Sequence, residues 1–347
     1  SKNRAFVFID EIQRKENAGL FLKGLYDMKG NFKFIVSGSG SLELKEKIAE
    51  SLMGRKRVIE LRPVSFFEFV NYKTKNKYQN KIADFLNIEK EKCRILLEEY
   101  LNFGGYPKVI TAETREEKQI HINEIYNSYL DRDIKGLLSL EKPESFTKLI
   151  RLLAADMGQT INYSKLGTDT GLAAETLKKY LYYAEKTFCI QHVSAYFTNK
   201  IKESNKASKI YFNDIGLRNY AIDEFGLLTR EQEFAFPFEN LILDILKERI
   251  KNSSSQIHFW RTTDKAEVDF VIDTGKELIP VEVKFSSYKQ AHLPPSLKNF
   301  INKYNCKQAY LVNLSLNETI HYEACHVRFL TLGSLSNITF HSSRETG

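Results

Sequence analysis

Cysteine is scarce in this chain, and its placement excludes two kinds of stabilised small domain. The 347 residues contain four cysteines. They stand at Cys93, Cys189, Cys306 and Cys325, and none belongs to a Cys-x-x-Cys pair. Zinc ribbons need Cys-x-x-Cys pairs, and disulfide frameworks are typical of small domains that are dense in cysteine, so we expect neither. The pattern favours a protein of the reducing cytoplasm.

Long apolar runs and phosphate loops are missing as well. No stretch of about 18 or more apolar residues occurs, which argues against a membrane helix. No signal peptide precedes the first expected strand, and repeats and low-complexity segments are absent. The phosphate-binding pattern Gly-x-x-x-x-Gly-Lys-Ser/Thr occurs nowhere, so the usual cradle for nucleotide phosphates is lacking. We therefore expect weak or absent ATP binding by this chain.

What is present is the composition of a globular protein of more than one domain. The apolar fraction is 42%, an ordinary value, and single cores stop growing at roughly 250–300 residues. The net charge of +7 is compatible with nucleic-acid binding but does not demand it. The chain opens with Ser1 and enters an apolar strand almost at once. We expect it to be part of a longer parent protein.

The N-terminal segment shows the pattern of a parallel α/β sheet. Residues 5–9 form a continuous apolar run, which is typical of a central strand covered on both faces. Alternating strand and helix patterns follow, and this order predicts parallel strands. The expected helices are 18–29 and 42–53, and the further strands are 32–36 and 58–61.

Acidic residues follow the first strand, at the sheet edge where open α/β sheets bind ligands. Asp10 would hold Mg²⁺ through water, and Glu11 would polarise a water that attacks the nucleotide. The alternative is an acidic helix N-terminus, which the helix dipole favours. Ser37 and Ser39 could sense the terminal phosphate or form a plain turn. Arg55 could supply a transition-state arginine or lie in a solvated turn.

The middle of the chain is mainly helical. Ser65 and Glu68 have the spacing of a capping box, and the glycines of residues 103–107 separate two helices. Helix, Gly-containing turn and helix over 163–185 give a helix-turn-helix pattern, with strands 189–193 and 209–212 as its wing. Lys178 and Lys179 of the second helix could meet phosphates around a major groove. Such units also serve as protein-packing modules, and that alternative stays open. The other expected helices are 81–86, 90–101, 116–138 and 146–157.

The C-terminal third contains the strongest chemical signal. Two apolar runs flank the turn at 273–276, which predicts a β-hairpin. Glu282 and Lys284 then share a face, and the hairpin brings Asp269 beside them. With Glu239 on the preceding helix, this set is typical of metal-dependent phosphodiester cleavage. The alternative is an exposed hairpin with paired charges. The other elements expected here are helix 238–251, strand 257–261, helix 294–304 and strand 308–313.

Several segments occur in the order of one known family. They are Phe8-Ile9-Asp10-Glu11 (as a Walker B strand), Val36-Ser37-Gly38-Ser39 (as a sensor), Gly54-Arg55, Gly104-Gly105-Tyr106-Pro107, Lys209-Ile210-Tyr211-Phe212, Phe238-Glu239-Asn240, Glu267-Val268-Asp269-Phe270 and Pro280-Val281-Glu282-Val283-Lys284. The chain resembles the prokaryotic AAA+-like (STAND-type) P-loop ATPases that end in a restriction-endonuclease-like, PD-(D/E)xK domain.

The resemblance implies an α/β architecture with five parts. These are a P-loop ATPase core that lacks its Walker A part (1–70), a helical lid (71–140), a winged helix-turn-helix domain (141–220), a restriction-endonuclease-like α/β domain (221–335) and a tail (336–347). ATP and Mg²⁺ would be the cofactors of the full-length parent. Nucleic acid would be the partner, with DNA favoured over RNA, and a homo-oligomer is compatible with the sequence.

Two functions are consistent with these residues. In the first, the chain is an ATPase fragment fused to a nuclease that acts on DNA. Asp269 and Glu282 would hold the metal, Glu239 would assist, and Lys284 would orient the nucleophile. In the second, the chain is an ATP-regulated switch whose nuclease-like fold binds a partner without cutting.

Overall fold

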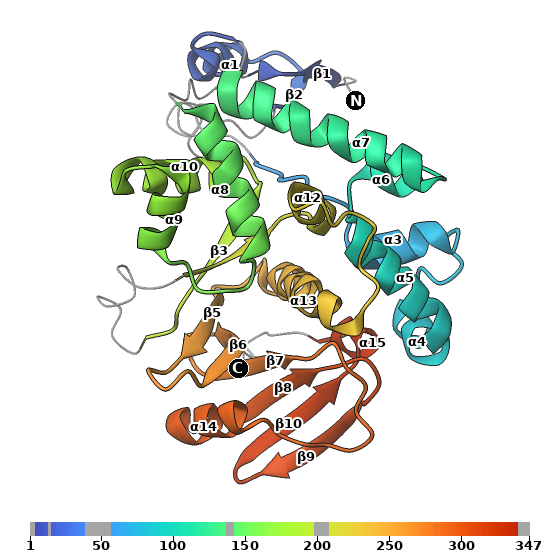
Figure 1. Cartoon of the computed structure of the whole chain (residues 1–347). Coiled ribbons are helices and arrows are strands. Elements are labelled where there is room, and N and C mark those ends of the chain that lie inside the picture. The colour runs from blue at the N-terminus through green and yellow to red at the C-terminus, as the bar shows by residue number, and fades with distance from the viewer. Residues whose placement is uncertain (1–3, 13–14, 39–56, 137–141, 198–207, 339–347) are drawn as a thin grey trace. The chain divides into compact units, whose positions relative to one another are not determined.

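The computed structural model describes residues 4–12, 15–38, 57–136, 142–197 and 208–338 (Figure 1). The chain divides into two compact units. The first comprises Ser1–Arg62, Glu124–Leu149 and Tyr163–Ile190; the second comprises Pro63–Asn123, Ile150–Asn162 and Gln191–Gly347. The five domain bounds expected from the sequence remain predictions.

A short parallel sheet and one helix begin the first unit. Strands β1 (Ala5–Ile9) and β2 (Phe32–Val36) pair in parallel, and α1 (Ala18–Asp27) connects them. Leu22 of α1 belongs to a small core against which Ile9 and Val36 pack. The strand-helix-strand order predicted for this segment is confirmed.

Two expectations for this segment were wrong. The first strand is not covered on both faces: Phe6 and Phe8 are 59% and 74% exposed, because the packing against α1 involves the face that carries Ile9. Residues 58–61 form no strand, and Leu61 is 95% exposed. An apolar run becomes a strand only where a neighbour accepts its backbone hydrogen bonds, and the described part of this sheet has two strands. The expected helix 42–53 lies outside the described residues.

The helix-turn-helix pattern is present as helices α9 (Tyr163–Thr170) and α10 (Ala174–Lys186). Gly171 occupies the turn between them with a φ of +68°, a conformation that glycine adopts without strain. Buried Leu177 and Tyr180 anchor α10, whereas Lys178 and Lys179 are exposed. The preceding helices are α7 (Arg115–Ser128), the π-helical segment Tyr129–Gly136 and α8 (Pro143–Ala155).

Helices also open the second unit. They are α3 (Phe66–Lys73), α4 (Ile82–Ile88), α5 (Lys90–Phe103) and α6 (Pro107–Thr111). The predicted capping box starts α3: the Ser65 amide donates to Glu68 Oε2 at 2.8 Å, and the Glu68 amide donates to Ser65 Oγ. Gly104, with a φ of +75°, ends α5, and Pro107 starts α6. Both sequence signals are thus confirmed.

A mixed six-stranded sheet forms the C-terminal part of the second unit, in the order β5-β6-β7-β8-β10-β9 (Figure 1). Two helices pack on it: α13 (Ala235–Ile250) against β7, and α14 (Pro295–Tyr304) against β6 and β7. The strands are β5 (Gln256–Arg261), β6 (Glu267–Asp273), β7 (Leu278–Val283), β8 (Gln308–Val312), β9 (Glu318–Tyr322) and β10 (Cys325–Leu330).

Other short elements complete the second unit. Strands β3 (Ile190–Ser194) and β4 (Ser208–Phe212) pair as a separate two-stranded sheet, so both predicted strands are present. Their assignment as a wing stays a prediction. Helices α12 (Ile215–Ala221) and α15 (Leu332–Leu335), the 3-10 helix Glu231–Phe234 and strands β9 and β10 were not predicted.

Candidate functional site

The predicted hairpin exists and joins β6 to β7. The strands are antiparallel, with Phe270 opposite Val281 and Asp273 opposite Leu278. Thr274 and Gly275 lie in the turn between them, and Gly275 has a φ of +77°. The alternation of apolar and charged residues therefore predicted the element that carries Asp269 and Glu282.

A β-bulge lies in β6 where Asp269 stands. On β5, His258 and Trp260 are two residues apart, but their partners Val271 and Val268 are three apart. One extra residue is thus inserted at Asp269 or Phe270. Val268 and Val271 consequently both join the core cluster that packs on α14, although simple alternation would place them on opposite faces.

The bulge leaves the Asp269 carboxylate directed at the neighbouring strand. Its Oδ2 accepts a hydrogen bond from the Val283 backbone amide at 2.8 Å. Val283 directly follows Glu282, so this bond fixes the Asp269 carboxylate beside the second predicted ligand. The structure therefore brings these two residues together as expected.

Glu282 is a carboxylate in a core position. It lies opposite Leu311 of β8, which belongs to the apolar core, and it is 4% exposed. Oε1 lies 2.7 Å from Lys284 Nζ, whereas the buried Oε2 has no hydrogen-bond partner among the described residues. Burial, together with the charge of Asp269, raises the pKa of Glu282 to about 8. A buried carboxylate oxygen without a partner is costly and needs a ligand or a proton.

Lys284 differs from Glu282 in its access to solvent. Its side chain is 40% exposed. Burial would lower the pKa of Lys284, but Asp269 and Glu282 outweigh that effect and raise it. Lys284 is therefore a protonated ammonium at the edge of the site.

Glu239 comes from α13 and is held by residues of β4. Tyr211 Oη donates to Glu239 Oε1 at 2.5 Å, and Lys209 Nζ lies 3.5 Å from the same oxygen. Glu239 is 8% exposed. Burial, followed by the charge of Asp269, raises the pKa of Glu239 to about 7. The structure thus places Glu239 within electrostatic range of Asp269.

Lys209 and Glu267 extend this cluster, and neither was predicted as a site residue. Lys209 is 1% exposed, and its Nζ lies 2.6 Å from Glu267 Oε1. Burial would lower the pKa of Lys209, but Glu239, Asp269 and Glu267 raise it. One sequence signal could have indicated Lys209. The other four residues of its strand are apolar, aromatic or small, and a lysine buried among them needs a charged or polar partner.

The donor set fits a divalent cation in part. Among the described residues, no group of three or more His, Cys, Asp or Glu side chains could hold a metal ion. Asp269 and Glu282 are two neighbouring carboxylates, and Glu282 Oε2 is an unpartnered oxygen ligand. Mg²⁺ is commonly bound through one or two carboxylates, with waters and substrate phosphates as further ligands. Two carboxylates therefore suffice for such an ion.

The N-terminal acidic pair lies in the first unit, at the carboxyl end of β1. Ser37 follows β2, and its hydroxyl donates to Asp10 Oδ1. The Ser37 amide donates to the Ile9 carbonyl at 2.9 Å. Glu11 has a φ of +52° and is exposed. The parallel sheet thus brings together Asp10 and Ser37, whereas Ser39 and Arg55 lie outside the described residues.

Three segments of the chain match families of known proteins. Residues 1–70 match the family of AAA domains. Residues 94–227 and 236–330 match two domains of unknown function, DUF8612 and DUF4143. The chain therefore carries an AAA domain, which implies nucleotide binding in general terms, and the hairpin site falls within DUF4143.

Similar proteins occur in bacteria and archaea, and those found are uncharacterized. One from Haemophilus influenzae is 25% identical over 88% of this chain and 72% of its own length. One from Methanocaldococcus jannaschii is 28% identical over 81% of this chain and 61% of its own. One from Mycobacterium tuberculosis is 24% identical over 81% of this chain and 59% of its own. The chain thus spans only part of each relative. None of the described helices is long and apolar enough to cross a membrane.

Proposed function

We propose that the C-terminal part of this chain hydrolyses phosphodiester bonds in nucleic acid with the help of a divalent metal ion. The observation that carries the proposal is Glu282, a buried carboxylate with one unpartnered oxygen beside Asp269 and Lys284. This arrangement matches the residue order of PD-(D/E)xK nucleases.

Each side chain has a distinct task in this proposal. Asp269 and Glu282 would hold the ion, which would supply Lewis-acid activation of the attacking water. The hydrogen bond from the Val283 amide keeps Asp269 in place. Lys284 has a raised pKa and stays protonated, so it orients the attacking water and stabilises negative charge; it does not serve as a base.

Glu239 has a supporting task. Lys209 and Tyr211 fix its carboxylate from β4. Its charge interacts with Asp269, so it adds to the negative field that attracts a cation. Glu239 therefore assists the metal-binding pair from α13.

The AAA domain supplies the second part of the proposal. In a protein that also contributes a phosphate-binding loop, Asp10 would hold Mg²⁺ through water and Glu11 would polarise the attacking water. The contact between Ser37 and Asp10 supports a sensor role for the strand that precedes Ser37. ATP is the proposed nucleotide.

DNA is the favoured partner. Helix α10 exposes Lys178 and Lys179, whereas Leu177 and Tyr180 are buried. The major groove of B-form DNA admits a helix, whereas that of A-form RNA is too deep and narrow to be read. A net charge of +7 adds a sequence-independent attraction to phosphates.

The test is a cleavage assay with Mg²⁺ or Mn²⁺ on duplex DNA, single-stranded DNA and RNA. Glu282→Gln and Lys284→Ala remove the two central charges, and Glu318→Gln on exposed β9 is the matched control. We expect cleavage by the wild type and by Glu318→Gln, and a loss of roughly 100-fold or more in the two site variants. Equal background cleavage by all four proteins would refute a nuclease.

A second candidate function is a non-catalytic switch. Two observations favour it. Lys284 Nζ forms an ion pair with Glu282 Oε1 at 2.7 Å. Among the described residues, no group of three His, Cys, Asp or Glu side chains could hold a metal ion. In this case the nuclease-like domain binds DNA or a protein partner. Metal-independent DNA binding without cleavage in the same assay would favour this candidate.

A further inference from the structure

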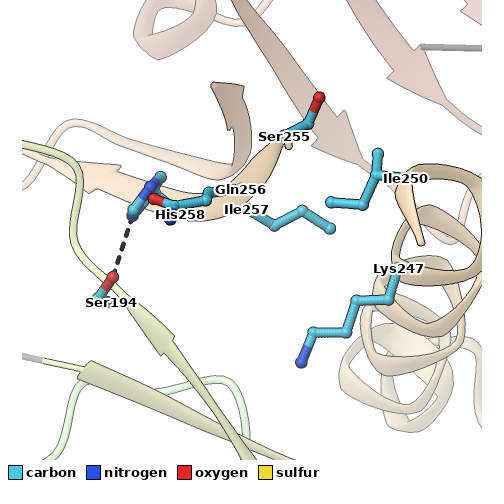
Figure 2. A pocket seen from close by; sticks show the side chains of 7 residues that line it. All are labelled: Ser194, Lys247, Ile250, Ser255, Gln256, Ile257 and His258. Atoms are coloured by element: carbon cyan, nitrogen blue, oxygen red, sulfur yellow. Dashed lines mark hydrogen bonds between the residues drawn. The ribbon is translucent and has the colours of Figure 1, made fainter. Parts of the chain in front are cut away.

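A cavity of about 370 Å³ lies between β3, α13 and β5, and neither Asp269 nor Glu282 lines it. Ser194 comes from β3, Lys247 from α13, and His258 from β5 (Figure 2). This volume falls at the small end of the range for small-molecule sites. We call it the β3–α13–β5 cavity.

The polar groups of the cavity suit an anion. Ser194 Oγ and His258 Nδ1 share a hydrogen bond of 3.0 Å, drawn as a dashed line in Figure 2. Lys247 extends from α13 toward the open space in the same view, and Gln256 adds an amide to the wall. None of the described residues that line the cavity is acidic. A cation would therefore find no carboxylate there, whereas an anion meets an ammonium, an imidazole and a hydroxyl.

The Lys247 ammonium is held in place by a network that joins the Gln191 and Asn240 amides and the Asp244 carboxylate. Lys247 Nζ donates to Gln191 Oε1 at 2.6 Å, and Gln191 Nε2 donates to Asp244 Oδ1 at 2.8 Å. Asn240 Nδ2 donates to the other oxygen of Asp244 at 3.1 Å. Fixing the donor in advance reduces the entropy lost when a ligand binds.

The remaining wall is apolar. Ile250 of α13 and Ile257 of β5 line the side of the cavity next to Lys247 (Figure 2). A ligand that fills the cavity therefore needs an anionic end and a less polar body. A bare ion would leave this wall exposed to water.

We propose that the β3–α13–β5 cavity binds a small phosphate ester of about mononucleotide size, with the phosphate against Lys247 and His258 and the body against the isoleucines. Phosphate offers several acceptor oxygens, and the cavity offers several donors at fixed positions. The proposal is independent of nuclease activity, because none of the cavity residues belongs to the carboxylate site.

The test is isothermal titration of the whole chain with inorganic phosphate, AMP and a 5′-phosphorylated oligonucleotide. Lys247→Met keeps the aliphatic stem and removes the charge, and Lys247→Arg keeps the charge. Lys251→Met, on an exposed lysine at the end of the same helix, is the matched control. We expect AMP to bind more tightly than phosphate, and Lys247→Met to weaken both by roughly 10- to 100-fold.

His258→Gln provides a second, independent variant, and we expect it to weaken AMP binding as well. Lys247→Arg should retain most of the affinity, and Lys251→Met all of it. Equal affinities in the wild type and Lys247→Met would overturn the proposal. So would binding of the oligonucleotide alone, because the phosphate would then belong to a nucleic-acid surface.

Discussion

Lys209 is the residue on which the charge balance of the hairpin site depends. It is almost fully buried, and its ammonium contacts both Glu267 and Glu239. Removing one member of a buried ion pair leaves the other charged in a medium that solvates it poorly. Lys209 therefore positions Glu239, and its charge also interacts with Asp269.

We predict that Lys209→Met destabilises the protein, and more strongly at high pH. At pH 8 the free energy of unfolding should fall by roughly 3–5 kcal/mol, because the buried Glu239 loses its counter-ion, whereas Glu267 keeps Arg261. The pKa of Glu239 is already raised to about 7. A raised carboxyl pKa gives stability that is present at low pH and is lost as pH rises through the folded-state pKa. The loss should therefore be smaller at pH 5.5.

Urea unfolding of the wild type and Lys209→Met at pH 5.5 and 8 measures this difference. The double variant Lys209→Met/Glu239→Gln is the control, because it also removes one unpaired carboxylate. It should recover part of the lost stability at pH 8. The same loss at both pH values, with no recovery, would show that Lys209 acts through packing alone.

At the scale of elements, the ends of α5 and α12 meet at very close range. Asp214 accepts hydrogen bonds from the Gly105 amide at 2.7 Å and from the Leu217 amide at 2.8 Å, and thereby holds both helix ends. A Cβ added to Gly216 would lie 2.1 Å from the carbonyl oxygen of Phe103. Such a contact is possible only for glycine.

We predict that Gly216→Ala destabilises the protein, whereas Gly24→Ala does not. Alanine at 216 would push the backbone of α12 away from that of Phe103. Such overpacking lowers the free energy of unfolding by roughly 1–3 kcal/mol or more. Gly24 lies within α1, and a Cβ there would meet nothing within 4 Å. Alanine at 24 should therefore be neutral or stabilise by up to about 1 kcal/mol. Thermal unfolding of both variants measures the difference, and equal melting temperatures would contradict it.

The elements also show which parts of the fold a sequence can predict. The hairpin was predictable because a period of two and a Gly-containing turn are local signals, and Glu282 and Lys284 follow directly from that period. The bulge at Asp269 or Phe270 was not predictable from the sequence, because it depends on how β6 pairs with β5. The partners of Glu239 are 28 residues or more distant in sequence, so no local pattern indicates Tyr211 or Lys209.

The strand predicted at residues 58–61 was wrong for the same reason, because a strand depends on long-range neighbours. An apolar run has the composition of a buried strand, but its burial depends on neighbours that the run does not encode. The exposure of Leu61 shows the result. Local chemistry therefore predicted the hairpin that carries Asp269 and Glu282, and it did not predict the long-range contacts around these residues. Their role as metal ligands stays a prediction.

At the scale of the whole molecule, the excess of positive charge bears on the proposed binding of DNA. The net charge of +7 includes the exposed Lys178 and Lys179 of α10. If α10 lies against DNA, each lysine that neutralises a phosphate releases counterions, and affinity then falls linearly on a log–log plot against salt.

We predict that replacing Lys178 and Lys179 together by alanine reduces the salt slope of DNA binding by about 1.8, since each phosphate contact contributes roughly 0.9. Fluorescence anisotropy of a labelled duplex between about 50 and 200 mM KCl measures the slope. The control is Lys75→Ala/Lys90→Ala, which removes two exposed lysines of the second unit. A smaller slope in the α10 variant alone would assign the phosphate contacts to that helix. The same reduction in both variants would mean that the binding follows net charge, and an unchanged slope would remove α10 from the DNA interface.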